Sequence, residues 1–310
     1  PGQPLQQFTT SVAQEDLEKT LADWRYNLEK PFTTSEGKAL GQALYSWLIQ
    51  PMQSTLEAAN IQTLVFVLDG ALRNVPMAAL YDGDRYLIER YAVSLSPSLY
   101  LLGPQPLEKI SIVTLLAGLT QSRHGFSALL NVENELQTVN NLVNSSLLLN
   151  EAFTTDSLAQ QVAKSEQSIV HLATHGQFSS NADETFILAW DRPIPVNELS
   201  AILKTGDLKR TNPIELLILS ACETATGNSR AALGLAGMAL QSGTRSTLAS
   251  LWNLDDASSA IFVNQFYQNL VQQQVTKAEA LRQAQLALLH NPNYRHPTYW
   301  AAYVLVGNWL

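Results

Sequence analysis

The feature that most constrains the fold is a regular alternation of apolar, strand-like runs and amphipathic helical patterns after residue 103. The runs that predict strands are residues 110–116, 146–149, 169–173, 215–219 and 246–251. Helical patterns lie between them, near residues 132–144, 155–164, 231–241 and 256–273. Alternation of this kind predicts an α/β fold, a mostly parallel sheet flanked by helices on both faces. Ligands bind such sheets beyond the carboxyl ends of the strands.

The first part of the chain predicts two helices followed by a strand. Apolar residues recur at helical spacing from residue 15 to about residue 50, with a break at Pro31. The β-branched and aromatic run at residues 63–68 predicts a buried strand that ends at Asp69-Gly70. This part therefore reads as a smaller helical and α/β unit.

A boundary between the two halves is predicted near residues 103–109, where Gly and Pro interrupt the pattern. Just before it, turn residues within 78–92 suggest a small hairpin. The expected divisions are an N-terminal helical segment at 1–60, a small α/β portion at 61–105 and a larger α/β portion at 106–310. Two separate domains and one extended sheet both satisfy this pattern.

Composition excludes several classes of function. The chain has 310 residues, 46% of them hydrophobic, and can bury one large core or two modest ones. Only 15% of the residues are charged, the net charge is −8, and we find no cluster of Lys and Arg, which argues against a nucleic-acid partner. The longest apolar runs have strand length, far below the roughly 20 residues that cross a bilayer. No membrane insertion is expected.

The chain begins without Met and without a signal-peptide pattern, so we expect residue 1 to be an artificial or processing boundary of a longer protein. A single cysteine excludes an internal disulfide and predicts a reducing, cytoplasmic location. The position of that one thiol, Cys222, is therefore informative.

Two predicted strands end on residues that carry chemistry. One ends on His175-Gly176, and the other ends on Cys222. If the two strands are parallel neighbours, a thiol and an imidazole emerge at the same edge of the sheet. A free thiol with a pKa near 8.5 is mostly protonated at pH 7, and a neighbouring imidazole removes its proton during attack. The N–H groups of Gly176 and Cys222 are the expected oxyanion hole, since a residue without Cβ allows a close approach.

The residues around these strand ends resemble the sequence blocks of the CHAT domain, a branch of the caspase and separase superfamily. The matching blocks, in the family's order, are HLATHG at 171–176, LSACET at 219–224, GLAG at 234–237, SLWNLDD at 250–256 and HPTYWAAY at 296–303. Residues 68–70, 74–76 and 91–98 resemble the N-terminal portion of the family, so the resemblance covers roughly residues 60–310. It implies a caspase-like catalytic portion at 106–310 with Cys222 as nucleophile and His175 as base. The 47-residue step between them agrees with the roughly 50 residues of caspases.

Departures from the family pattern bear on substrate choice. Caspases have Gln where this chain has Ser220, and Arg-Gly where it has Glu223 and Thr224, so specificity for aspartate is not expected. Separases have an Asp at the position of Asn253.

Acidic residues nevertheless lie close to these positions. Asp255 and Asp256 follow Asn253, and Asp183 and Glu184 follow His175 in an expected loop. A basic substrate side chain is therefore the preferred hypothesis. The predicted substrate-binding residues are Ser220, Glu223, Asn253, Asp255, Asp256 and Asp183.

Other residues have simpler structural interpretations. His171 is expected to be a buried histidine bonded to a neighbour, and His124, His290 and His296 are expected to be structural. Glu223 is an alternative third catalytic member, although its side chain should point away from the cysteine, and a dyad without an acid is the default. Trp252 and Trp300 are expected to be packing residues, and a role in shaping a substrate pocket is the less favoured alternative.

The sequence thus predicts a cysteine endopeptidase that needs no cofactor and holds no metal. Calcium dependence stays open, because acidic loops can bind it weakly. The alternatives are a catalytically silent interaction module and a protease gated by a partner. The resemblance implies a protein or peptide substrate, and a helical-repeat region or regulator in the parent protein.

Overall fold

The computed structural model describes residues 4–98, 106–107, 112–164, 166–178, 184–205, 213–220, 223–224 and 243–310. Its helices are α1 (Gln14–Leu28), α2 (Thr34–Leu48), α3 (Gln53–Ala58), α4 (Leu87–Arg90), α5 (Val132–Leu142), α6 (Thr155–Ala163), α7 (Val196–Thr205), α9 (Asp256–Tyr267), α10 (Lys277–Leu289) and α11 (Pro297–Trp300). Its strands are β1 (Thr63–Phe66), β2 (Ala92–Leu95), β3 (Val113–Gly118), β4 (Asn144–Leu149), β5 (Ile169–Ala173), β6 (Gly176–Phe178), β7 (Phe186–Leu188), β8 (Pro193–Pro195), β9 (Leu216–Ser220), β10 (Glu223–Thr224), β11 (Ser246–Ser250) and β12 (Tyr303–Gly307).

Eight strands form the main sheet, in the order β1-β2-β12-β11-β9-β5-β3-β4. Neighbours run parallel except β11 and β12, which pair antiparallel. A second sheet, in the order β10-β6-β7-β8, lies beyond the carboxyl ends of β5 and β9. The predicted parallel neighbours β5 and β9 are adjacent, with Ala173 paired to Ser220.

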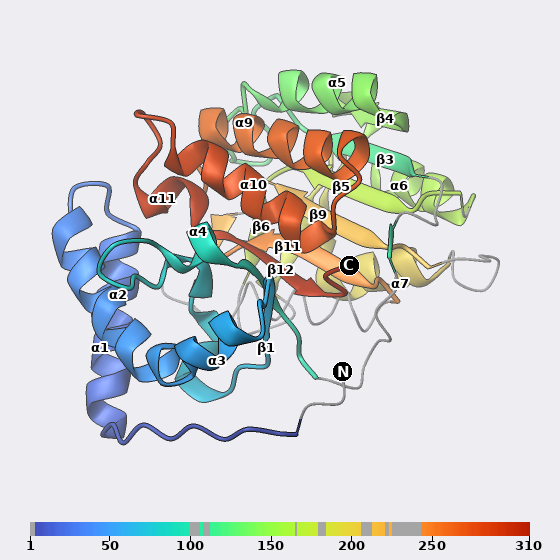
Figure 1. Cartoon of the computed structure of the whole chain (residues 1–310). Helices are drawn as coiled ribbons and strands as arrows, with labels where there is room; N and C mark the ends of the chain where they lie inside the picture. The colour runs from blue at the N-terminus through green and yellow to red at the C-terminus, as the bar shows by residue number, and fades with distance from the viewer. Residues whose placement is uncertain are drawn as a thin grey trace.

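Helices cover both faces of the main sheet (Figure 1). The larger apolar cluster joins α5, α9 and α10 to one face, and the smaller joins α6 and α7 to the other. Alternation along β5 sorts its side chains between them: Ile169 and Ala173 belong to the first cluster, and Val170 and Leu172 to the second. The predicted α/β class with helices on both faces is confirmed.

The N-terminal part packs onto the same sheet. Helices α1 and α2 lie side by side (Figure 1), and Trp24 and Leu44 are buried between them and the rest of the core. The two predicted helices and the break near Pro31 are confirmed. Strands β1 and β2 extend the main sheet beyond β12, so this sheet contains strands from both halves of the chain. The division near residue 105 stays a prediction, since residues 99–105 lie outside the described part.

The other predicted strands agree with the structure to within three residues at each end, and β5 agrees at both ends. Helices near 132–144, 155–164 and 256–273 are confirmed as α5, α6 and α9, the last extended by a π-helical turn over Gln268–Gln272. The helix predicted at 231–241 lies outside the described residues.

One prediction needs correction. The hairpin predicted within 78–92 is reduced to a single bridge between Tyr81 and Tyr86, followed by α4. The carboxylate of Asp82 accepts the N–H groups of Asp84 and Arg85 and closes a tight turn there. Helix α4 begins at Leu87, directly after the bridge, so the ladder does not continue. None of the described helices has the length and apolar character needed to cross a membrane.

Candidate active site

His175 lies two residues after the end of β5, and hydrogen bonds of Thr174 and of its own carbonyl fix the backbone there. Thr174 donates its N–H to the carbonyl of Ser220 (3.3 Å) and its hydroxyl to the carbonyl of Leu188 (2.7 Å). The carbonyl of His175 accepts the N–H of Leu188 at 2.8 Å. His175 is 9% exposed, so the surrounding residues immobilise it without enclosing it completely.

The imidazole of His175 is oriented by the loop after β3. Its Nε2 lies 2.8 Å from the carbonyl oxygen of Ser127, and the ring of Phe126 packs against it at a centroid distance of 5.0 Å. Because a carbonyl oxygen only accepts, Nε2 carries a hydrogen and donates it. In the neutral ring, Nδ1 is then the basic nitrogen. Sequence reasoning missed Ser127, since a backbone carbonyl leaves no signal in residue type.

The second sheet continues from His175. Gly176 begins β6 and faces Ile187 of β7. The neighbouring hydrogen bond from Leu188 N–H to His175 O makes Gly176 and Ile187 a non-hydrogen-bonded pair. The antiparallel ladder with β7 therefore does not use the N–H of Gly176, the group predicted for an oxyanion hole.

The predicted nucleophile Cys222 and the predicted substrate residue Asp183 lie outside the described residues. The backbone on either side of Cys222 is described. Ser220 pairs with Ala173, two residues before His175, and Glu223 pairs with Gln177, two residues after it. The side chains of Glu223 and Thr224 lie outside the described part, and their predicted roles stay predictions.

A buried polar network lies under these strand ends. Glu135 Oε1 of α5 lies 3.1 Å from His171 Nε2 and accepts the hydroxyl of Ser220 at 2.8 Å. His171 Nε2 is also 3.0 Å from Ser220 Oγ, and its Nδ1 is 3.4 Å from Tyr267 Oη. The expectation of a buried, bonded His171 is confirmed. Ser220 is 1% exposed with its hydroxyl in this network, and a substrate contact for it stays a prediction.

The acidic residues after β11 have local structural roles. Asp255 Oδ1 accepts the N–H of Ser258 and caps α9, and Asp256 Oδ2 accepts the N–H and the side-chain amide of Asn131, each at 2.8 Å. Asp255 and Asn253 are exposed, and Asp256 is half-buried. Their predicted role in binding a basic side chain is not tested by these contacts.

His296, Trp252 and Trp300 make contacts that support the fold, whereas His124 and His290 are exposed. His296 caps α11 by accepting the N–H of Thr298, and burial lowers its pKa. His124 Nε2 contacts the carbonyl of Trp190 at 3.2 Å, and His290 ends α10. The indoles of Trp252 and Trp300 are buried, and each donates its N–H to a backbone carbonyl. Within the described residues, no group of three or more His, Cys, Asp or Glu side chains is placed to hold a metal.

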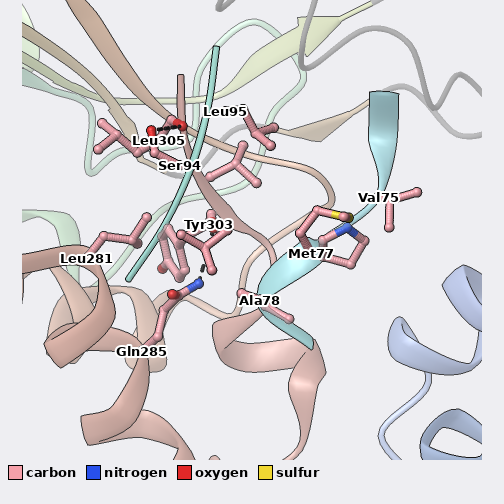
Figure 2. A pocket seen from close by; sticks show the side chains of 13 residues that line it. Val75, Met77, Ala78, Ser94, Leu95, Leu281, Gln285, Tyr303 and Leu305 are labelled. Atoms are coloured by element: carbon pink, nitrogen blue, oxygen red, sulfur yellow. Dashed lines mark hydrogen bonds between the residues drawn. The ribbon is translucent and has the colours of Figure 1, made fainter. Parts of the chain in front are cut away.

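A small apolar pocket lies elsewhere, where β2 meets β12 (Figure 2). Ser94 donates its hydroxyl to the carbonyl of Leu305 (3.1 Å), and Gln285 donates to the carbonyls of Trp300 and Tyr303 (3.0 and 3.2 Å). Other lining residues include Val75, Met77, Ala78, Leu95 and Leu281. Strands β11 and β9 separate β12 from β5, so this pocket does not belong to the histidine site.

Comparison with known proteins places the whole arrangement in a family. A family model described as the CHAT domain matches residues 38–308. This chain belongs to the CHAT domain family. Among curated proteins, tetratricopeptide repeat protein 28 of Mus musculus is 24% identical over 325 residues, which cover 86% of this chain and 13% of that protein. The Homo sapiens protein of the same name is 23% identical over 323 residues, with the same coverage. The CHAT chain thus spans about an eighth of these relatives.

Solved structures show the fold of this CHAT domain. The complex of Porphyromonas gingivalis RgpB pro- and mature domains has a TM-score of 0.53 at 12% identity and covers 96% of this chain and 76% of that chain. The Arg-specific cysteine proteinase gingipain R has a TM-score of 0.51 at 10% identity and covers 96% and 74%. The Saccharomyces cerevisiae separase–securin complex has a TM-score of 0.51 at 13% identity and covers 85% and 17%. The CHAT domain therefore has a caspase-like fold.

Proposed function

We propose that this CHAT domain is a cysteine endopeptidase in which Cys222 is the nucleophile and His175 the general base. The observation that carries the proposal is the hydrogen bond from His175 Nε2 to the carbonyl of Ser127. It fixes the ring, leaves Nδ1 basic and stabilises the imidazolium that forms when Nδ1 accepts a proton. In the proposed dyad this backbone carbonyl orients the histidine, a role that an acidic side chain has in catalytic triads, so the proposal needs no carboxylate.

The position of Cys222 in the chain supports the pairing. Ser220 and Glu223, the described residues that flank Cys222 in sequence, pair with residues two before and two after His175, which supports the proposed pairing of the thiol with this histidine. Membership of the CHAT family and the caspase-like fold support the same assignment. The N–H groups of Gly176 and Cys222 are the proposed oxyanion hole.

The reaction divides into acylation and hydrolysis. His175 Nδ1 takes the thiol proton while the sulfur of Cys222 bonds to the scissile carbonyl carbon, and the carbonyl oxygen becomes an oxyanion. The C–N bond then breaks as His175 returns the proton to the departing amine, leaving a thioester. Water, deprotonated by His175, attacks that thioester. The C–S bond breaks, the peptide acid leaves and the thiol regains its proton.

A basic residue before the scissile bond is the proposed preference. Three carboxylates near the proposed catalytic residues in sequence support it: Asp183, Asp255 and Asp256. Ser220, Glu223 and Asn253 are further proposed substrate contacts. Gingipain R, which shares the fold, is itself described as Arg-specific. A protein or peptide is the proposed substrate in a reducing, cytoplasmic setting.

The proposal is tested by exposing a diverse peptide library to the chain and identifying the cuts by mass spectrometry. Cys222→Ala and His175→Ala should abolish every specific cut, while His290→Ala, which removes an exposed histidine at the end of α10, should leave the pattern unchanged. Cuts that persist in Cys222→Ala would refute the mechanism. A dominant preference for acidic or apolar residues before the cut would refute the proposed specificity.

A partner-gated enzyme is the second candidate. The observation that favours it is the size of the curated relatives, of which this chain covers 13%. Those relatives are tetratricopeptide repeat proteins by name, and the separase structure contains securin, so a repeat region or regulator of the parent protein is the proposed partner. If the chain alone cleaves no peptide but the longer parent protein does, the enzyme is gated. If neither cleaves any peptide, the domain is a silent module.

A further inference from the structure

Glu135 is a carboxylate placed where an apolar residue would be expected. It lies on the buried face of α5, together with Val132, Leu136 and Val139, and is 3% exposed. A buried carboxylate is costly unless hydrogen bonds compensate for its lost hydration. Those bonds come from Ser220 at 2.8 Å and His171 at 3.1 Å.

The directions of the hydrogen bonds follow from the chemistry of the groups. The Ser220 hydroxyl donates to Glu135 Oε1, and the Nε2–H of His171 is shared between that oxygen and Ser220 Oγ, at 3.1 and 3.0 Å. Tyr267 Oη lies 3.4 Å from His171 Nδ1, and burial, reinforced by the charge of Glu135, raises the pKa of this phenol. Tyr267 therefore keeps its proton and acts as donor, and the chain of hydrogen bonds ends on one carboxylate oxygen.

This network lies next to the proposed reactive groups along two strands and one loop. Ser220 donates its hydroxyl to Glu135 while its carbonyl accepts the N–H of Thr174, the residue before His175. Cys222 follows Ser220 by two residues. The segment that carries Glu135 also supplies Ser127, whose carbonyl holds the His175 ring. One loop and helix thus contact both strand ends.

We propose that Glu135 is a positioning residue that acts through Ser220 and His171 to hold the end of β9 against the residue before His175, and thereby supports the reactivity of the proposed dyad. The inference rests on the proposed cysteine–histidine chemistry and adds to it a support built from buried residues of α5, β5 and β9. It also gives Ser220 a role: its hydroxyl ties the end of β9 to α5, and its carbonyl ties that strand to the residue before His175.

The test uses the single thiol of the chain as its own reporter. The rate of Cys222 alkylation by iodoacetamide is measured from pH 5 to pH 10 at 25 °C for the unmutated chain and for His175→Ala, Ser220→Ala and Glu135→Met. Ser246→Ala is the matched control, because Ser246 is also fully buried and donates its hydroxyl to the carbonyl of Glu215 at the other end of β9. Thermal unfolding of each variant is recorded in parallel.

We expect Ser220→Ala to lower the alkylation rate at pH 7 at least fivefold and Glu135→Met at least tenfold, with both pH profiles moving toward that of a free thiol near pH 8.5. The alkylation rate of Ser246→Ala should stay within about twofold of that of the unmutated chain, although the variant loses a comparable amount of stability. Unchanged rates in Ser220→Ala and in any folded Glu135→Met, with a slowed His175→Ala, would overturn the positioning role alone. An unchanged His175→Ala would overturn the dyad and the positioning role together.

Discussion

Lys277 enters the core at the start of α10 with its ammonium group fully buried. Its Nζ lies 3.7 Å from Glu215 Oε2, too far for a hydrogen bond, while Arg245 Nε lies 3.0 Å from Glu215 Oε1. Desolvation outweighs the attraction of Glu215 and lowers the pKa of Lys277 from 10.5 to about 8. The same burial raises the pKa of Glu215. Both shifts disfavour the charged forms.

The lowered pKa predicts a pH dependence with a definite sign. Well below pH 8 the folded and unfolded chains both carry the protonated lysine, so Lys277 contributes no slope. Between pH 8 and 10.5 the unfolded chain binds a proton that the folded chain has released, so the free energy of unfolding rises with pH. The gain from Lys277 between pH 8 and pH 9.5 is about 1.5 kcal/mol.

The measurement compares urea unfolding of the unmutated chain and of Lys277→Met at pH 7, 8 and 9.5. The comparison removes the titration of other groups, and Lys19→Met, which removes an exposed lysine from α1, controls for the loss of one charge. From pH 8 to pH 9.5, the free energy of unfolding of the unmutated chain should rise by about 1.5 kcal/mol relative to that of Lys277→Met. A difference that does not change with pH would show that Lys277 is hydrated in the folded chain and would refute the reasoning.

Three further substitutions test separate parts of the structure. Phe126→Ala removes the ring packed 5.0 Å from His175 and should lower kcat/KM for peptide cleavage about tenfold by loosening the imidazole, with little change in KM. Asp255→Ala removes the cap of α9 and should lower the free energy of unfolding in urea by about 1 kcal/mol, whereas Asp255→Ser keeps the cap. If both variants cleave basic peptides more slowly, Asp255 contacts the substrate. Normal cleavage rates in both variants would exclude that contact. Gly118→Ala places a Cβ 2.7 Å from Leu136 Cδ1 and should destabilise the chain by about 1–3 kcal/mol, and an unchanged urea midpoint would contradict the tight packing of β3 under α5.

The sequence predicted the centre of the sheet well because its central strands are continuous apolar runs ending in polar residues. Strand β5 begins and ends as predicted, and its neighbour β9 lies beside it with the expected parallel direction. The proximity of His175 to the end of β9 followed from that pattern alone. The placement of Cys222 lies outside the described residues and stays a prediction.

Strand direction at the edge of this centre could not be predicted. Strand β12 is fully buried, and an apolar run of this kind fits equally well in either direction, so its insertion between β2 and β11, antiparallel to β11, leaves no mark on the sequence. The contact of His175 with Ser127 was equally hidden, since it uses the main chain. Glu135 did leave a signal: it occupies an apolar position in the helical period of α5, where a charge calls for a buried partner.

The two buried carboxylates near the ends of β9 differ in what surrounds them. Glu215 faces two cations, Arg245 and Lys277, and precedes the strand at the edge away from the histidine site. Glu135 faces a hydroxyl and an imidazole, and its partner Ser220 is the last residue of the strand. Changes at the first cluster should therefore alter stability and its pH dependence, whereas changes at the second should alter the reactivity of the thiol. If both clusters changed only stability, the network beneath His175 would be an ordinary buried polar contact.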